Sequence, residues 1–404
     1  MTGVRTVRAF GVGAVLGAVM VVGTAQAAGA QPAPVVPGPA LSVATVLDGL
    51  SKPWDVVQAP DGAVLTGERS GRFVVSRPDG SSGEVAADLS DLFVAGETGL
   101  MGIALSRDFA SNRTLYTCQG HRNPGAASPA GSLDTGSLDT GSVDGSDRDV
   151  RVVSWTVDDN WTQLTRGADV LTGIPIGSTG RHGGCRVLAH SDGTLYIGAG
   201  DSASPTAPQD RSSLAGKVLH VNVDGTPAAG NPDPAGPVFT LGHRNVQGLA
   251  VQPGTGRLYG IEQGTTADDE VNLLVAGSNY GYRPDRLPGV YDESVPMTDP
   301  NRVPGAVAAV WSSGAPTIAT PGGTFLDGAS WGEWAGTLVV TSQQAQKLVL
   351  LRLAADGRSV TEQSVALEGQ FGRLRSATLA PDGALLLTTD NGSGDKVLRV
   401  TPAS

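Results

Sequence analysis

The sequence predicts an all-β fold and, within that class, a β-propeller. Its 404 residues include 57 Gly and 26 Pro. A helical protein does not tolerate this load, because each interior Gly costs about 1 kcal/mol and each Pro about 3 kcal/mol relative to Ala. Hydrophobic residues make up 40% of the chain, which is enough for a large core and argues against disorder. A turn-and-strand phrase also returns along the chain, and this repetition favours the propeller among all-β folds.

The repeated phrase is a Pro/Ser-Asp-Gly turn followed by a four-residue strand. It occurs at 60–65, 191–196 and 381–386, and in a degenerate form at 253–259. Asp-Gly turns are hairpin signals, and a strand–turn–strand unit that returns over a long chain indicates radial repetition. A pair of β-sandwiches is the alternative, but no linker divides the chain. We therefore expect one propeller domain over 41–404.

Short apolar and β-branched runs between these turns are the expected strands. Nearly every run is flanked by Asp-Gly or Gly-rich dipeptides, so each is predicted to end in a hairpin. No convincing stretch has the 3.6-residue period of an amphipathic helix. The clearest runs are Val64–Thr66, Phe73–Val75, Arg151–Trp155, Thr194–Ile197, Leu338–Val340 and Ala384–Leu387.

The N-terminus has the pattern of an export signal. Two arginines precede the apolar stretch 9–22, which ends in the small-residue exit Ala25-Gln26-Ala27. A membrane anchor, the alternative, needs about 20 apolar residues. We expect 1–27 to be a signal peptide, 28–40 to be a semi-extended Ala/Pro-rich tether, and the mature protein to be secreted without a transmembrane segment.

The two cysteines, Cys118 and Cys185, would meet an oxidising compartment after export. A disulfide between them is possible, but pairing depends on geometry that the sequence does not contain. The segment 123–149 carries repeated Gly-Ser-Leu-Asp-Thr copies. Because such residues cannot form a core, we expect a low-complexity surface loop, with Ca²⁺ binding by its aspartates as an alternative role.

The charge balance excludes nucleic acid as a partner. Charged residues make up 17% of the chain and the formal net charge is −11, whereas phosphate binding requires a basic surface. Against this acidic background, Arg373 and Arg375 stand at i and i+2, on one face of a predicted strand. Two like charges in that position call for an anionic partner, either internal Asp/Glu or a polyanionic ligand.

His182 is one of only five histidines and lies just before a predicted strand. If the segment is extended, His182, Gly184 and Arg186 point to one face. The glycine would leave a gap for a small ligand between an imidazole and a guanidinium. An imidazole beside a fixed cation suits a general base. The alternative is a surface histidine beside a turn.

Two further segments are rich in polar groups. Arg244, Asn245 and Gln247 lie between apolar strands, where burial without a polar partner is costly. Together they can bind carboxylates and carbonyls, although a solvated hairpin end is the alternative. The acidic loop 262–272 follows, and oxygen-rich loops of this kind can bind Ca²⁺. Its spacing does not match an EF-hand, so the motif alone is a weak signal.

These segments, in this order, resemble the soluble quinoprotein glucose/sorbosone dehydrogenase family, whose members include aldose sugar dehydrogenases that use pyrroloquinoline quinone (PQQ). The resemblance runs from about Leu50 to Pro402, and its most specific block is 242–281. The matching phrases are Gly49–Asp55, Gly96–Leu105 with Asp108-Phe109, the His182 segment, Gly216–Leu219 with Asp224-Gly225 and Asn231-Pro232, Gly242–Leu249, Glu262–Gly264, Asp268–Asn272, Gly277–Gly281 and the Arg373/Arg375 pair.

The resemblance implies a six-bladed propeller with PQQ and Ca²⁺ near its axis. It implies oxidation of the C1 hydroxyl of an aldose to the lactone by hydride transfer to PQQ, with an external electron acceptor as a further partner. His182 matches the general base and Arg244 the cation beside the quinone oxygens, an electrostatic role. Backbone carbonyls that hold Ca²⁺ map to Gly264 and Thr265. The matched cofactor-binding positions are Glu97, Asn245, Gln247, Arg373 and Arg375.

The chain also departs from the family pattern. Thr265 replaces a frequent Pro, a change that a backbone ligand survives. Arg181 precedes the base where glucose-specific members have Asp. Gln344 stands where the family has a lysine, so either Lys347, three residues later, reaches the cofactor instead or the contact is lost.

Two other functions remain open from the sequence. The first is a propeller that binds a sugar or a partner without redox chemistry, which the changes at Arg181 and Gln344 keep open. The second is a Ca²⁺-dependent hydrolase or lactonase. That activity would need side-chain carboxylates and an Asn around the metal, and no such set is evident.

Overall fold

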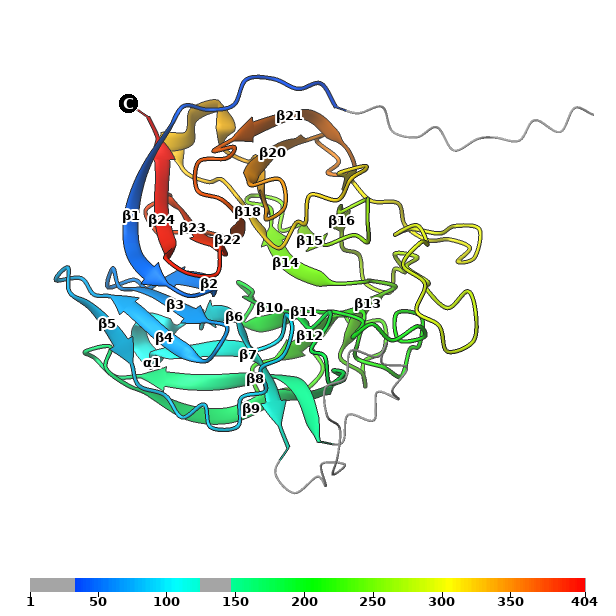
Figure 1. Cartoon of the computed structure of the whole chain (residues 1–404), viewed down its shortest axis with the longest axis horizontal. Coiled ribbons are helices and arrows are strands. Elements are labelled where there is room, and N and C mark those ends of the chain that lie inside the picture. Colours follow the sequence, from blue (N-terminus) through cyan, green and yellow to red (C-terminus); the bar gives the residue numbers. More distant parts are fainter. Residues whose placement is uncertain (1–32, 124–146, 404) are drawn as a thin grey trace, which may run out of the picture. The chain divides into compact units, whose positions relative to one another are not determined.

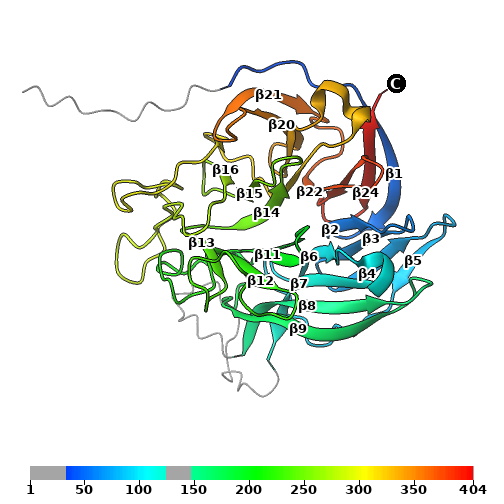
Figure 2. The same cartoon turned by 180° about the vertical axis from the view of Figure 1, so that it is seen from behind.

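The computed structural model describes residues 33–123 and 147–403. Over these residues the strands form six antiparallel sheets of four strands each. The sheets are arranged radially, as Figure 1 and the reverse view in Figure 2 show. The prediction of an all-β, six-bladed propeller is therefore confirmed. In the same part of the chain, no helix combines the length and the apolar character that a membrane crossing requires.

Each blade begins with an inner strand and continues outward, and the six inner strands contact one another in a ring around the axis. Two short helices, α1 (Phe109–Asn112) and the 3₁₀ helix η1 (Ala329–Trp334), lie between strands. The blades are β2 (Pro53–Gln58), β3 (Val64–Glu68), β4 (Arg72–Ser76) and β5 (Ser82–Val85); β6 (Leu100–Leu105), β7 (Thr114–Arg122), β8 (Arg148–Val157) and β9 (Leu164–Ile174); β10 (Gly184–Ala189), β11 (Thr194–Ala199), β12 (Lys217–Asn222) and β13 (Val238–Leu241); β14 (Val246–Val251), β15 (Leu258–Glu262), β16 (Glu270–Leu273) and β17 (Trp311–Ser312); β18 (Gly323–Phe325), β19 (Leu338–Ser342), β20 (Lys347–Leu353) and β21 (Val360–Ala366); and β22 (Leu374–Leu379), β23 (Leu385–Thr389) and β24 (Asp395–Pro402), with β1 (Leu41–Leu50).

The last blade takes its outermost strand from the other end of the domain. Strand β1 pairs antiparallel with β24, from Leu41 opposite Pro402 to Leu50 opposite Asp395. The N-terminal strand thereby covers the edge that the C-terminal strand would otherwise expose. This pairing closes the ring of blades.

Neighbouring inner strands approach so closely that some positions accept only glycine. At Gly102 in β6, an added Cβ would lie 2.5 Å from the carbonyl oxygen of Cys185 in β10. Real Cβ atoms do not occupy such a position, so a side chain there would push two blades apart. Apolar clusters fill the spaces between blades farther out, with Trp155 and Phe73 packed edge to face between the first two blades.

The predicted strands all lie within observed ones, except that Ala384 immediately precedes β23. The proposed signal peptide and most of segment 123–149 lie outside the described residues, and β8 begins at Arg148, inside that segment's expected end. Of the proposed tether, residues 33–40 run along β21, where the Val36 amide donates to the Gln363 carbonyl at 2.9 Å.

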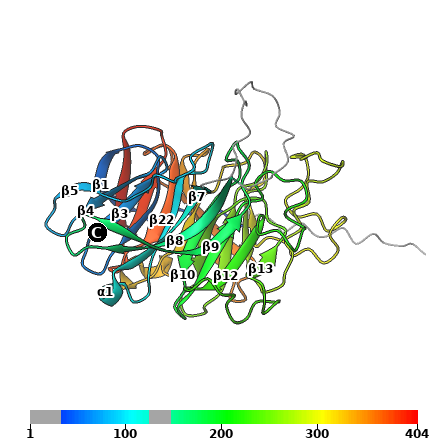
Figure 3. The same cartoon turned by 90° about the horizontal axis from the view of Figure 1, so that it is seen from below.

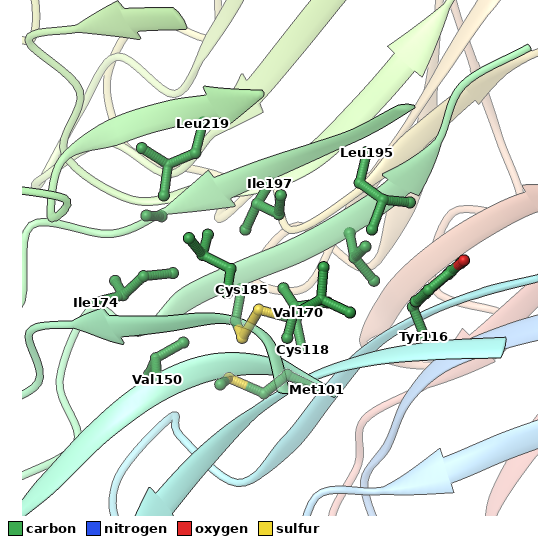
Figure 4. Close-up of a cluster of buried hydrophobic side chains, with 14 of the residues drawn as sticks. Met101, Tyr116, Cys118, Val150, Val170, Ile174, Cys185, Leu195, Ile197 and Leu219 are labelled. Atoms are coloured by element: carbon green, nitrogen blue, oxygen red, sulfur yellow. A yellow bond between two sulfur atoms is a disulfide. The ribbon is translucent and has the colours of Figure 1, made fainter. Parts of the chain in front are cut away.

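The cysteines form a disulfide, which settles the question that the sequence left open. Cys118 in β7 and Cys185 in β10 have Cα atoms 5.3 Å apart, and both are fully buried. Figure 4 shows the bond within a cluster that includes Met101, Val150 and Ile197. The cross-link therefore joins the second and third blades at the start of an inner strand.

We predict that the double variant C118A/C185A folds but is less stable. The disulfide spans 67 residues, and a loop of that length is expected to contribute about 2–4 kcal/mol, largely by restricting the unfolded chain. Guanidinium denaturation monitored by fluorescence would measure the difference. Wild-type protein unfolded with and without a reductant is the control. An unchanged free energy of unfolding would contradict the prediction.

Candidate active site

Four of the residues singled out in the sequence meet in one hydrogen-bonded network across the axis. The Glu97 carboxylate, in the loop before β6, accepts hydrogen bonds from the side-chain amides of Asn245 and Gln247, each at 3.0 Å. The Gln247 carbonyl oxygen accepts a bond of 3.1 Å from the Arg375 guanidinium. The second, fourth and sixth blades thus contribute to a single polar surface.

Asp390 contacts both Arg373 and Arg375, through its backbone carbonyl and its carboxylate respectively. Arg375 Nε lies 3.0 Å from Asp390 Oδ2, and Arg373 Nε donates to the Asp390 backbone carbonyl at 3.1 Å. Gln343 donates to the same carboxylate. Burial lowers the pKa of the Arg375 guanidinium, whereas the Asp390 charge acts in the opposite direction. One internal carboxylate therefore compensates Arg375, while the Arg373 guanidinium has no carboxylate partner among the described residues.

An ion pair and an indole ring lie beneath this surface. The Arg186 guanidinium pairs with the buried Asp55 carboxylate, and its Nε donates to the backbone carbonyl of Gln247 at 2.9 Å. The guanidinium carbons of Arg186 and Arg375 lie 4.7 and 5.1 Å from the ring centre of Trp54. Such distances give favourable cation–π contacts. The Trp54 ring thus contacts both cations.

The backbone around His182 differs from the extended segment considered in the sequence. His182, Gly184 and Cys185 have φ values of 53°, 61° and 72°, all left-handed. The pairing of β10 with β11 is irregular between Gly184 and Arg186. His182 therefore precedes the strand in a tight turn, and the one-face alternation with Arg186 does not apply. An added Cβ at Gly184 would lie 2.2 Å from the Gly200 amide, so only glycine fits this turn.

The His182 imidazole is held by a carboxylate. Its Nδ1 lies 2.8 Å from Asp201 Oδ1, and the Tyr291 hydroxyl donates to Asp201 Oδ2 at 2.6 Å. A carboxylate can only accept, so Nδ1 carries the proton and Nε2 is the basic nitrogen. His182 is 2% exposed, and none of the described residues hydrogen-bonds its Nε2. This arrangement is suited to proton abstraction by Nε2.

Arg244 lies beside the histidine with part of its donor capacity unused. Its terminal nitrogens donate to the Gln263 carbonyl at 2.9 Å and to the Glu293 carboxylate at 2.8 Å. Its Nε is buried without a hydrogen-bond partner in the described part of the chain. Glu293 also pairs with Arg181 at 2.5 Å. The positive charge that Arg181 adds near the base is thus compensated by a residue that also contacts Arg244.

A buried acidic network supports the backbone of Arg244. Glu262 accepts hydrogen bonds of 2.9 Å from the Arg244 amide and the Asn272 side chain, and its other contact is His243 Nδ1, also at 2.9 Å. Asn272 also donates to Glu270 at 3.3 Å. Burial, together with the nearby Glu262 charge, raises the pKa of Glu270 to about 8.

The loop after β15 is fixed by one buried carboxylate. Asp269 accepts hydrogen bonds from the Gly264 amide at 3.0 Å, the Ile318 amide at 2.6 Å and the Thr317 hydroxyl at 2.8 Å. No described group donates a hydrogen bond to the carbonyls of Gly264 or Thr265. Within the described ranges, no three His, Cys, Asp or Glu side chains gather as metal ligands. A cation here would need backbone oxygens.

Comparison with known proteins places the chain in a family. The model of the glucose/sorbosone dehydrogenase family matches residues 50–399. The chain belongs to this family. It is 26% identical to aldose sugar dehydrogenase YliI of Escherichia coli, over 90% of this chain and 93% of that protein. It is 29% identical to quinoprotein glucose dehydrogenase B of Acinetobacter calcoaceticus, over 59% of this chain and 51% of that protein. The PQQ-bound structure of aldose sugar dehydrogenase from Streptomyces coelicolor is 29% identical, covers 91% of this chain and 99% of its own, and superposes with a TM-score of 0.70.

One residue singled out from the glucose/sorbosone dehydrogenase pattern does not join the site. Lys347 begins β20, and its ammonium lies 3.3 Å from the Glu368 carboxylate. Gln344 is exposed, and the neighbouring Gln343 is the residue that contacts Asp390. This side of the polar surface therefore presents amides where the family pattern has a lysine.

Several residues of this candidate site had no assigned role in the sequence. Asp55 was visible as a lone acid within an apolar strand, inside a phrase already matched to the family. Asp201 follows a strand directly, which is a common place for functional side chains. Tyr291 and Glu293 lie in a long connection without periodic pattern, so nothing in the sequence marked them.

We predict that Glu270 makes stability depend on pH. A carboxyl whose folded pKa is raised to about 8 holds its proton more tightly when folded. Its stabilising contribution is therefore present below its unfolded pKa and is lost as the pH rises to about 8. The slope approaches about 1.4 kcal/mol per pH unit. Glu270→Gln, which mimics the protonated acid, should flatten the dependence between pH 5 and 8. Urea denaturation at several pH values measures the free energy of unfolding. If this free energy depends on pH equally in the wild type and in Glu270→Gln, the prediction is refuted.

Proposed function

We propose that the protein is a PQQ- and Ca²⁺-dependent aldose dehydrogenase that oxidises the C1 hydroxyl of a sugar to the lactone. The family and its named relatives support an oxidoreductase. The observation that carries the finer proposal is the orientation of His182. Its Nδ1 is held by Asp201, and its turn is tied to the polar surface, since the Gly184 amide donates to Asn245 at 3.1 Å.

The residues present fit the proposed cofactor. PQQ is a planar tricarboxylate ortho-quinone, which requires cations and amide donors around its edge. Arg373, Arg375, Asn245 and Gln247 supply these, and the buried unpartnered Nε of Arg244 needs an acceptor of the kind a quinone oxygen provides. Glu97 orients the two amides.

The Ca²⁺ part of the proposal depends on the loop after β15. The carbonyls of Gly264 and Thr265 accept no hydrogen bond from described groups, and Asp269 fixes the loop that carries them. Carbonyl oxygens are suitable ligands for this hard cation. Ca²⁺ bound there would polarise a quinone carbonyl as a Lewis acid.

The chain's own residues then carry out the proton chemistry. His182 Nε2 accepts the proton of the C1 hydroxyl, and Asp201 stabilises the imidazolium that results. Tyr291 keeps Asp201 in place through its hydroxyl, and burial raises the pKa of this phenol well above its usual value, so it remains a donor. When bound, PQQ supplies the acceptor for the hydride that leaves C1. An external acceptor would take up the electrons.

Reconstitution tests the proposal. Purified protein would be incubated with PQQ and Ca²⁺ and then mixed with a redox dye and a panel of aldoses. Sugar-dependent dye reduction is the expected result. Tight sugar binding without dye reduction would instead identify a sugar-binding propeller and refute the enzymatic proposal.

We predict that His182→Ala lowers turnover by about 10²–10⁴-fold, the usual contribution of a general base, while PQQ affinity stays close to that of the wild type. The matched control is His190→Ala, because His190 pairs with Asp192 at a turn between β10 and β11 and belongs to no part of this network. Steady-state dye reduction measures turnover. Full activity in His182→Ala would remove the base assignment.

We also propose that the protein is exported after cleavage behind Ala27. The signal pattern of the sequence supports this, as does a disulfide, which persists in oxidising compartments. N-terminal sequencing of protein recovered from the culture medium should begin at Ala28. An intact N-terminus on protein retained in the cell would contradict the proposal.

A further inference from the structure

A groove lies between the first and last blades, beside the polar surface of the candidate site. Its volume is about 270 Å³. It is open to solvent, and two of its lining residues are cations. The groove is lined by Ser51, Lys52, Arg69, Ser70, Val94 and Gly392.

Neither cation of the groove has a partner among the described residues. The Arg69 guanidinium and the Lys52 ammonium appear in no ion pair and no hydrogen bond there. The nearby acids are already used. Glu68 pairs with Arg72, and the buried Asp395 accepts from backbone amides, including that of Lys52 at 3.0 Å. Two uncompensated cations that line one groove, in a chain of net charge −11, form a local site for an anion.

Backbone hydrogen bonds fix the two segments that carry these cations. The Arg69 amide donates to the Lys52 carbonyl at 3.1 Å, and the Arg69 carbonyl accepts from the Leu100 amide at 3.0 Å. The Arg69 stem packs against Gly99, where an added Cβ would lie 2.8 Å from its Cγ. The charges are therefore presented from a rigid base.

Residues that line or contact the groove are close in the sequence to residues of the candidate site. Gly99 is two residues from Glu97, and Gly392 is two residues from Asp390, the partner of Arg375. After burial, the Arg69 charge is a further influence that lowers the pKa of Arg375. Like charges that influence each other are stabilised by an anion placed near both.

We propose that Arg69 and Lys52 form an anion site that binds the outward-facing carboxylates of PQQ. In the fifth blade, Gln344 is uncharged and Lys347 is paired with Glu368. Arg69 and Lys52 would supply the missing positive charge from the first blade. The inference rests on the proposed function, since it assumes that the polar surface binds this tricarboxylate. It adds two residues to the site that neither the sequence motifs nor the fold had assigned.

Titration of the apo-protein with PQQ in the presence of Ca²⁺ tests the inference without relying on activity. Tryptophan fluorescence would report binding, because Trp54 lies beneath the polar surface. R69Q and K52Q should each bind PQQ about tenfold more weakly, as expected for one lost charge-assisted contact. R69K should recover much of the affinity. The PQQ trimethyl ester, which lacks the negative charges, should bind wild type and R69Q alike.

R107Q is the matched control. Arg107 is exposed and follows β6 beyond Leu105, whereas Arg69 contacts the other end of that strand at Leu100. Helix α1, which begins two residues after Arg107, lies at the lower edge of the blades in Figure 3. R107Q removes the same charge and should leave PQQ affinity unchanged. Because Arg69 and Lys52 have no partners to lose, thermal unfolding should be the same for all variants.

The outcomes separate this inference from the proposed function. If wild-type protein binds no PQQ, both fail. If wild type binds PQQ and R69Q matches R107Q, the proposed function stands and the groove assignment is overturned. The groove assignment is also overturned by a second result. In this result R69Q binds PQQ normally and needs a higher concentration of an anionic acceptor such as ferricyanide, but not of a cationic phenazine. That result would make the groove an acceptor site.

Discussion

Charges buried at the axis must be paired, and this constraint determines the arrangement of the inner strands. Asp55 from the first blade pairs with Arg186 from the third, and Asp390 pairs with Arg375 within the sixth. Removing one partner of a buried pair typically costs about 3–5 kcal/mol. The Asp55–Arg186 pair therefore joins the first and third blades, and the guanidinium groups of both pairs lie near the Trp54 ring. The N–H groups that these ion pairs do not use remain available to bind a ligand at the polar surface.

The histidine turn shows how a rigid scaffold can support a reactive group. Gly184 permits the turn, Cys185 ties it to the second blade, and Asp201 fixes the imidazole from the next strand. Catalytic groups require positions accurate to within a fraction of an ångström. Here covalent, steric and electrostatic restraints act within four residues of the chain, so the histidine has little freedom to depart from its orientation.

Local signals predicted the strands well, because Asp-Gly turns and β-branched runs act over a few residues. Blade number and the grouping of Glu97 with Asn245 and Gln247 required the family resemblance, since these partners are about 150 residues apart. Lys347 was misleading because spacing alone does not say which way a side chain leaves a strand. Asp390 resembled an ordinary turn acid, and only the folded chain shows that it is the counter-ion of Arg375.

The pairing of β1 with β24 has a consequence for biogenesis. Leu41 and Pro402 stand opposite each other, so the last blade cannot be completed until residue 402 has left the ribosome. Contacts between such distant segments form slowly. A nascent chain with an unfinished blade stays incompletely folded for longer, which is the condition that passage through a narrow translocation channel requires. Ring closure thus couples maturation to the synthesis of strand β24.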